Sequence, residues 1–171
     1  MDLKNKIREV PNFPKDGILF YDITTLLKDP SGFQEVINRL SLPFLNKGIE
    51  KVVAIESRGF ILGAPLAQRL KAGFVPVRKP GKLPSDKIEE KYDLEYGSDC
   101  LAIHQDAISA GEKTLIVDDL LATGGTMRSA INLVTRLGGD ILGIAIVIEL
   151  AALKGREKIN GHPIISLITY D

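Results

Sequence analysis

The sequence from Leu115 to Met127 reads Leu-Ile-Val-Asp-Asp-Leu-Leu-Ala-Thr-Gly-Gly-Thr-Met. The apolar run at 115–117 predicts a buried strand that ends at the two adjacent carboxylates. Small residues follow, and apolar residues then recur at helical spacing as far as Leu137, where Gly138-Gly139 gives a stop signal. The stretch therefore predicts a strand, an acidic turn, a glycine loop and a helix, the unit from which an α/β fold is built.

The loop between this strand and helix suits a phosphate group. Its glycines let backbone N–H groups approach a ligand closely, and the helix N-terminus adds positive potential. Two threonine hydroxyls of the loop can donate to the same oxygens. The residues expected to contact phosphate are Ala122, Thr123, Gly124, Gly125 and Thr126.

The carboxylates of Asp118 and Asp119 would repel phosphate, but they can accept hydrogen bonds from sugar hydroxyls or hold Mg²⁺ through water. Together with the loop they predict a sugar-phosphate site. The sequence has no G-x-x-x-x-G-K-[ST] loop and no strand followed by G-x-G-x-x-G, so two common nucleotide motifs are excluded. The alternative interpretation is an ordinary strand-to-helix turn in which the aspartates only cap the helix.

Length and charge narrow the class of protein. The chain has 171 residues, enough for one domain with a sizeable core, and we expect a single domain over residues 1–171. Lys plus Arg and Asp plus Glu both number 22, and this zero net charge argues against bulk binding to nucleic acid. No apolar run could span a bilayer, and the first residues lack a signal-peptide core. With one cysteine, the chain fits the cytoplasm.

Alternating strand and helix patterns predict an α/β fold with a mostly parallel sheet flanked by helices. The expected strands are 51–55, 74–77, 113–117, 141–148 and 164–168, with a hairpin at 92–96 and 101–103. The expected helices are 3–8, from 29 to a stop at Pro43, from the end of the 56–59 segment to about 70, from 127 to 137 and 151–158, with polar loops at 11–17 and 78–91.

Three polar segments directly follow expected strands, namely 56–59, 78–79 and 118–119. Ligands of open α/β sheets bind at the carboxyl ends of the strands, so these segments should share one cleft. Arg58 could grip a phosphate with its guanidinium, or it could pair with Glu56 or Asp118.

Three further features, a basic cluster and two single side chains, each allow two interpretations. A basic cluster in the 78–91 loop, formed by Arg78, Lys79 and Lys82, could close over a polyanion as a lid or could be solvated surface. Glu95 could be a general acid or base, or an exposed strand carboxylate. Phe20 could stack on a flat heterocycle, although the sequence alone favours a core position.

The 117–126 segment resembles the phosphoribosyl pyrophosphate motif of type I phosphoribosyltransferases, and other segments resemble the adenine phosphoribosyltransferases among them. The similarity covers the chain from about Pro11 to Tyr170. The segments that carry it are Phe13-Pro14-Lys15-Asp16-Gly17-Ile18-Leu19-Phe20, Glu56-Ser57-Arg58-Gly59-Phe60, Arg78-Lys79-Pro80-Gly81-Lys82-Leu83-Pro84, Tyr92-Asp93-Leu94-Glu95-Tyr96-Gly97, Glu149-Leu150 and Leu153-Lys154-Gly155-Arg156.

The resemblance implies the type I phosphoribosyltransferase fold, with a small N-terminal hood over about residues 1–30 and a flexible β-hairpin loop. It implies that adenine and 5-phosphoribosyl 1-pyrophosphate become AMP and pyrophosphate, in purine salvage. It also implies Mg²⁺, bound mainly through substrate and water and not directly by protein ligands. A homodimer without nucleic-acid or membrane partners is expected.

The same resemblance assigns roles to residues. The 122–126 loop would hold the 5′-phosphate, and Asp118 and Asp119 would face the ribose hydroxyls. Glu95 would be the acid that assists adenine N7 as N9 attacks. The residues expected to face pyrophosphate are Arg58, Arg78, Lys79 and Lys82, and those expected to line the adenine pocket are Leu19, Phe20, Tyr21 and Leu150.

Two alternatives and one departure from the family pattern stay open at this stage. The chain could transfer another base, such as hypoxanthine, xanthine or orotate, or it could be a non-catalytic ligand sensor, which would need an added DNA-binding element. Many family members have Arg where this chain has Tyr21. If the side chain contacts the base there, base affinity or selectivity would differ.

Overall fold

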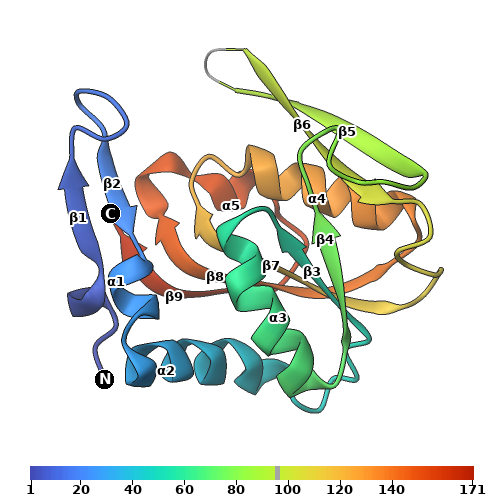
Figure 1. The fold of residues 1–171 in the computed structure, drawn as a ribbon, viewed down its shortest axis with the longest axis horizontal. Coiled ribbons are helices and arrows are strands. Elements are labelled where there is room, and N and C mark those ends of the chain that lie inside the picture. Colours follow the sequence, from blue (N-terminus) through green and yellow to red (C-terminus); the bar gives the residue numbers. More distant parts are fainter. Residues whose placement is uncertain (95–96) are drawn as a thin grey trace.

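The computed structural model describes residues 1–94 and 97–171. Its centre is a five-stranded parallel sheet with the order β4-β3-β7-β8-β9 (Figure 1). The strands are β3 (Lys51–Ile55), β4 (Gly73–Val77), β7 (Lys113–Leu121), β8 (Asp140–Leu150) and β9 (Ile164–Tyr170). The α/β architecture expected from the alternating pattern is confirmed.

The strand order reverses between β3 and β7. From β3 the chain crosses to β4 at one edge, and it later returns to β7 on the other side of β3. Because strand-helix-strand crossovers are right-handed, connections that run in opposite directions put their helices on opposite faces of the sheet. The carboxyl ends of β3 and β7 are therefore the natural ligand site of this sheet.

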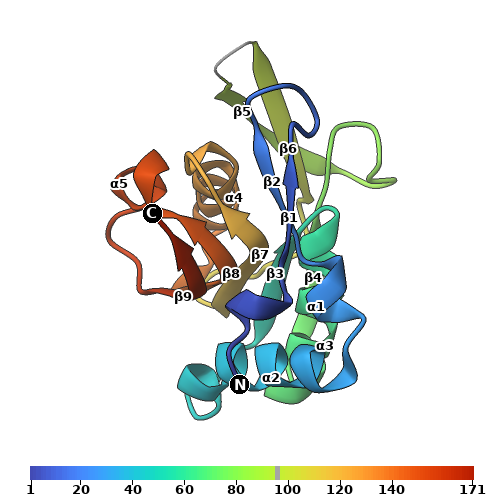
Figure 2. The same cartoon turned by 90° about the vertical axis from the view of Figure 1, so that its left-hand side faces the viewer.

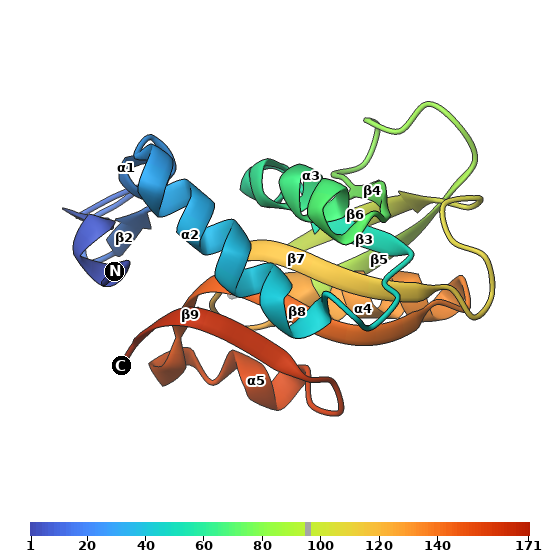
Figure 3. The ribbon, with the colours of Figure 1, turned by 90° about the horizontal axis from the view of Figure 1, so that it is seen from below.

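Helices cover both faces, and each face has its own hydrophobic cluster. Helices α2 (Pro30–Ser41) and α3 (Arg58–Leu70) pack on one face, where Leu62 and Leu66 meet Val52, Leu115 and Val117. Helix α4 (Gly125–Arg136) packs on the other face (Figure 2). Seen from below in Figure 3, α2 and α3 lie side by side, in agreement with the contacts between them.

Two small antiparallel sheets flank the core at its ligand-binding edge. The hood contains β1 (Arg8–Pro11), β2 (Leu19–Asp22) and the short helix α1 (Thr24–Leu27). The second sheet is a hairpin of β5 (Lys87–Asp93) and β6 (Ser98–His104), which extends beside α4. These two sheets and the carboxyl ends of the central strands surround the candidate site.

The hairpin differs from its expected position. Strand β5 begins at Lys87, inside the expected 78–91 loop, and the return strand already begins at Ser98. The reason is a polar inner face: Glu90 accepts a hydrogen bond from Asn132 on α4 (2.9 Å) and pairs with Arg136 (3.0 Å). Hydrophobic alternation cannot reveal a strand whose packing face carries a charge.

Three other boundaries are corrected. Strand β7 does not end at residue 117 but continues through both aspartates to Leu121, because the long β8 pairs with it as far as Glu149. Residues 3–8 form only a 3₁₀ turn at Lys4–Lys6 before β1 begins. The expected helix at 151–158 divides into a 3₁₀ turn and the short helix α5 (Gly155–Lys158), separated by a left-handed Lys154.

Candidate functional site

A cleft of about 370 Å³ opens at the carboxyl ends of β3 and β7. The predicted phosphate loop, both aspartates and the start of α3 meet there, as expected for segments that follow neighbouring parallel strands. The lining residues are Glu56, Ser57, Arg58, Asp118, Asp119, Leu120, Leu121, Ala122, Thr123, Gly124, Gly125, Thr126 and Met127. The sequence therefore predicted most of this cleft.

The phosphate loop has a backbone that depends on glycine. Gly124 has φ of 86° and directly precedes α4, so the loop turns sharply into the helix N-terminus. A Cβ at Gly124 would lie 2.5 Å from the carbonyl oxygen of Gly155, which leaves no space for a side chain. The loop thus presents its backbone to the cleft on one side and contacts the backbone of Gly155 on the other.

The two aspartates occupy different electrostatic environments. Asp119 is buried and pairs with Arg58, with 2.8 Å between its Oδ2 and the guanidinium Nε. Asp118 lies against the first turn of α3, where a Cβ at Gly59 would come within 3.1 Å of its carboxylate. Burial, and then the charge of Asp119, raise the pKa of Asp118 well above its usual range.

Arg78 and Lys82 converge on one carboxylate at the rim of the cleft. Arg78 Nε lies 2.9 Å from Glu56 Oε1, and Lys82 Nζ lies 2.6 Å from Glu56 Oε2. Burial alone would raise the pKa of Glu56, but the hydrogen bonds from Lys82 and Arg78 lower it, so this carboxylate is ionised at neutral pH. Arg78 also joins the 78–91 loop to the hairpin through backbone bridging with Ala102.

Lys79 points to the hairpin instead of Glu56. Its ammonium pairs with Asp99, and it donates to the Tyr92 hydroxyl at 3.4 Å. That hydroxyl also donates to Asp99 at 3.1 Å and accepts from Thr126 at 3.4 Å. The network links the hairpin to the phosphate loop. Asp99 was missed by sequence reasoning, because its side chain lies in a segment that was expected to be a turn.

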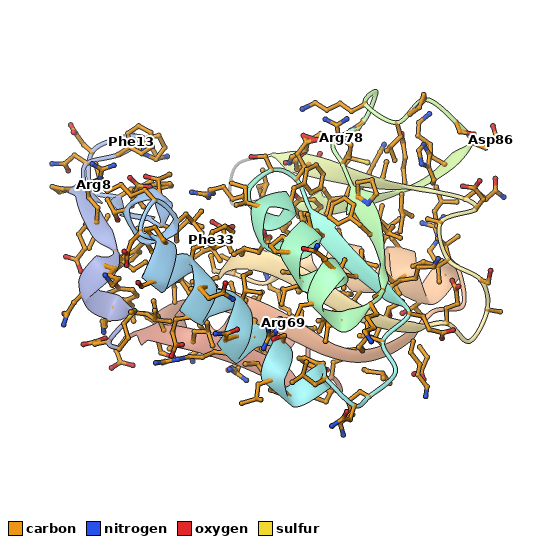
Figure 4. The ribbon with its side chains drawn as sticks, turned by 60° about the horizontal axis from the view of Figure 1, so that its bottom comes forward. Arg8, Phe13, Phe33, Arg69, Arg78 and Asp86 are labelled. Atoms are coloured by element: carbon orange, nitrogen blue, oxygen red, sulfur yellow. The ribbon has the colours of Figure 1, made fainter. Side chains whose placement is uncertain are left out.

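A second cavity of about 410 Å³ lies under the hood, and Arg58 borders both cavities. Its other lining residues are Arg8, Val10, Phe13, Phe20, Asp22 and Thr24. Phe20 contacts Phe13 edge-to-face and has the Arg58 guanidinium 5.2 Å from its ring centre. Figure 4 shows Arg8 and Phe13 together in the hood, with Arg78 beside the more distant 78–91 loop. The preference for a core position of Phe20 is therefore wrong.

The other three residues expected at the base do not line this cavity. Tyr21 alternates with Phe20 on β2, so its ring turns to the opposite face and packs on Tyr170 with 3.9 Å between ring centres. Leu150, like Tyr21, packs against the hydrophobic cluster on the α2 and α3 face of the sheet. Leu19 is 42% exposed. A base in this cavity could meet Tyr21 only through its backbone, so the family's Arg-to-Tyr difference would leave the side-chain lining of the cavity unchanged.

The cleft and the hood cavity do not test the predictions about Glu95 and about a metal site. Glu95 is not among the described residues. No cluster of three or more His, Cys, Asp or Glu side chains suited to a metal occurs within residues 1–94 and 97–171. No helix in these ranges is long and apolar enough to cross a membrane.

Comparisons with known proteins agree with the cleft and the fold. The profile of the phosphoribosyl transferase domain matches residues 25–168. An adenine phosphoribosyltransferase of Solibacter usitatus is 57% identical over 99% of this chain and 98% of its own, and one of a Synechococcus species is 57% identical over the full length of both.

Solved structures give the same result. The adenine phosphoribosyltransferase of Thermoanaerobacter pseudethanolicus superposes with a TM-score of 0.95 at 50% identity, over 98% of both chains. The enzyme of Saccharomyces cerevisiae, in a complex with an imino-altritol bisphosphate and adenine, superposes with a TM-score of 0.91 at 44% identity, over 96% of both chains.

The raised pKa of Asp118 predicts a stability gain on its neutralisation. The unfolded chain loses this proton near the ordinary value of about 4, whereas the folded protein keeps it to higher pH. Stability therefore falls as pH rises from the ordinary value to the raised one, and the loss persists above it. Asp118→Asn should remove this loss and raise the Tm at pH 8, by about 2–4 °C for each kcal/mol that the variant recovers.

Scanning calorimetry at pH 4 and pH 8 checks this expectation, with Asp119→Asn as the matched control. The control breaks the pair with Arg58 and should lower the Tm at pH 8. The gain for Asp118→Asn should be much smaller at pH 4, where the folded state is protonated and the unfolded state is only about half ionised. A lower Tm than wild type at pH 8 would contradict the assigned electrostatics.

Proposed function

The chain belongs to the phosphoribosyl transferase family and, within it, to the adenine phosphoribosyltransferases, and from that premise we propose how its residues divide one reaction between them. The protein is a pentosyltransferase that converts adenine and 5-phosphoribosyl 1-pyrophosphate into AMP and pyrophosphate. The observation that carries this conclusion is the phosphate loop and carboxylate pair in one cleft beside an aromatic hood cavity, in a chain so similar to enzymes of that name.

The phosphoribosyl donor binds the cleft in this proposal. Residues 122–126 hold the 5′-phosphate with backbone N–H groups and threonine hydroxyls at the N-terminus of α4. Asp118 and Asp119 accept hydrogen bonds from the ribose hydroxyls. Arg58, Arg78, Lys79 and Lys82 face the pyrophosphate. The carboxylates that now hold these cations support the assignment, because they keep several positive charges near one cleft without mutual repulsion.

Adenine binds under the hood, where the Phe20 ring offers a flat apolar face. The neighbouring Leu19 and Tyr21 contribute through their backbone, and Leu150 supports the pocket from below. This division assigns the donor to residues that follow β3 and β7, and the acceptor base to residues of the hood. Arg58 borders both cavities and so lies where the reacting atoms would meet.

The reaction breaks the C1′–oxygen bond to pyrophosphate and forms a bond between C1′ and adenine N9. Glycosyl transfer of this kind passes through an oxocarbenium-like state, which needs a stabilised leaving group more than a strong nucleophile. The basic side chains supply that stabilisation, and removing one such contact typically costs ~10²–10³ in rate. Glu95 assists adenine N7 as an acid while N9 attacks, and the proton that N9 carries passes to water as the new bond forms.

Mg²⁺ is the proposed cofactor, and it neutralises charge on the pyrophosphate oxygens when bound. The chemistry of the site fits this ion, because the carboxylates of Asp118 and Asp119 can hold Mg²⁺ through water molecules. Two carboxylates do not form a complete cage, so substrate oxygens and water supply most ligands. We also propose one catalytic domain over residues 1–171, with the hood at about 1–30, in the cytoplasm and in purine salvage.

A homodimer is proposed as the assembly. Large apolar side chains on α3 and the edge strand β4 support it, since Ile61 is 45% and Phe74 39% exposed. Sedimentation equilibrium should give twice the chain mass of 18.7 kDa. Ile61→Lys should shift the mass toward the monomer, whereas Leu42→Lys, at an exposed apolar position on another segment, should not. A wild-type mass equal to one chain would refute the dimer.

A panel of bases tests the function directly. Purified protein with Mg²⁺ and phosphoribosyl pyrophosphate should form AMP from adenine, and at most traces of nucleotide from hypoxanthine, xanthine or orotate. Liquid chromatography separates the nucleotides, and pyrophosphate release gives an independent measure. The absence of AMP would overturn the function, and preference for another base would leave the donor assignments but reassign the hood.

Glu95→Gln tests the proposed acid. The change keeps the size of the side chain but removes the titrating group, so kcat should fall by about 10²-fold or more. The pH–rate profile should lose the limb that this group contributes. Asp93→Asn, in the same hairpin and exposed, should leave both quantities unchanged. An unchanged kcat and pH–rate profile in Glu95→Gln would return Glu95 to an ordinary surface role.

A further inference from the structure

The backbone of the phosphate loop contacts Gly155, the first residue of α5. A Cβ at Gly124 would lie 2.5 Å from the Gly155 carbonyl oxygen and 3.1 Å from its Cα. In the reverse direction, a Cβ at Gly155 would collide with the carbonyl oxygen of Ala122. The two glycines therefore let two backbone segments touch, and the shape of the loop depends on where Gly155 lies.

Helix α5 is too short to fix that position by itself. It has four residues, and so short a helix has little intrinsic stability. Its C-terminal side is anchored by the buried Ile159 and by a hydrogen bond of 3.3 Å from Arg128 to the Lys158 carbonyl. The N-terminal side, which contacts the phosphate loop, needs a separate attachment.

Arg156 supplies that attachment. Its Nε and Nη2 donate to the two oxygens of Glu149 at 2.6 and 2.7 Å, which is the two-pronged geometry of a guanidinium with a carboxylate. Nη2 also donates to the Ser166 hydroxyl at 3.1 Å, and that hydroxyl donates to Glu149 at 2.7 Å. The fork fixes the residue next to Gly155 in both direction and distance.

Glu149, the partner of Arg156, lies in the central sheet close to the phosphate loop. Glu149 lies on β8, only 7% exposed, and pairs in register with Leu121, the last residue of β7 before the loop. Burial opposes its charge, but the hydrogen bond from Arg156, more than that from Ser166, lowers the pKa of Glu149. The carboxylate is therefore ionised at neutral pH and available to pair with the guanidinium.

We propose that Glu149 and Arg156 are positioning residues for the 5′-phosphate: their fork holds Gly155 against the phosphate loop and so aligns the backbone donors of residues 122–126. The inference rests on the proposed function, because it assumes that this loop binds the phosphate. Neither side chain lines the cleft, so each would act through the position of Gly155 and not by contact with substrate. Loss of the fork should thus weaken phosphate binding specifically and leave the adenine and pyrophosphate contacts intact.

Arg156→Lys is the first test, because it keeps the charge on Glu149 but loses the planar fork. The KM for phosphoribosyl pyrophosphate should rise about tenfold, at the lower end of losses seen when supporting partners of other site ligands are removed. The KM for adenine should stay within twofold of wild type. Arg39→Lys, which disturbs an ion pair between the Arg39 Nε and one oxygen of Glu35 on α2, far from the cleft, is the control and should change neither value.

Binding of ribose 5-phosphate, measured by calorimetric titration, separates positioning from general stability. Its Kd should rise about tenfold in Arg156→Lys, whereas the Kd of pyrophosphate should stay unchanged. The double variant Glu149→Gln with Arg156→Met removes the buried charge and the fork together, so it should fold and show the same selective loss even if Arg156→Lys does not fold.

The outcomes distinguish the inference from the proposed function. Ribose 5-phosphate affinity within twofold of wild type in whichever of these variants folds would overturn the positioning role, even if the wild type makes AMP. Equal weakening of ribose 5-phosphate, pyrophosphate and adenine would also overturn it, as a general structural effect. A wild type that binds ribose 5-phosphate but makes no AMP would refute the function and leave the role of the fork to be decided by the same titration.

Discussion

Strands β3 and β7 are neighbours in the sheet, but the chain leaves them for helices on opposite faces, α3 on one and α4 on the other. This divergence keeps the sheet edge between them uncovered, and the start of each helix faces it. Arg58 begins α3 after one strand, and Asp118 and Asp119 lie near the end of the other. The loop at the start of α4, the hood and the hairpin all surround this one opening.

Within the opening, carboxylates of the protein already hold its cations. Arg58 is held by Asp119, Arg78 and Lys82 by Glu56, and Lys79 by Asp99. A polyanionic ligand must compete for these cations, so part of its binding energy is spent on exchanging partners. The same pairs stabilise a concentration of charge that would otherwise be repulsive. Asp118 has a raised pKa and no such cation as its principal neighbour, which is a cost that the folded protein tolerates at its cleft.

The sequence predicted the features that depend on neighbouring residues in the chain, and it missed those that depend on contacts between distant segments. The phosphate loop, the aspartates and Arg58 follow strand ends, and strand ends of a parallel sheet meet in space, so their convergence could be foreseen. The polar inner face of β5, where Glu90 contacts Asn132 and Arg136 of α4, could not be recognised from hydrophobic alternation. The orientations of Phe20 and Tyr21 depend on the pairing of β2 with β1, which a short apolar segment does not specify. The contact of Gly155 with the loop involves residues far apart in the chain, and no local pattern predicts it.

The central claim is that the cleft and the hood cavity meet at Arg58 and together form one substrate site. A crystal structure of the protein with AMP tests it most directly, since this nucleotide contains the phosphate, the ribose and the base. The account predicts the phosphate on the backbone of residues 122–126, the ribose hydroxyls on Asp118 and Asp119, and the purine ring over Phe20. A phosphate bound instead by Arg78 and Lys82, or a purine outside the hood cavity, would contradict it.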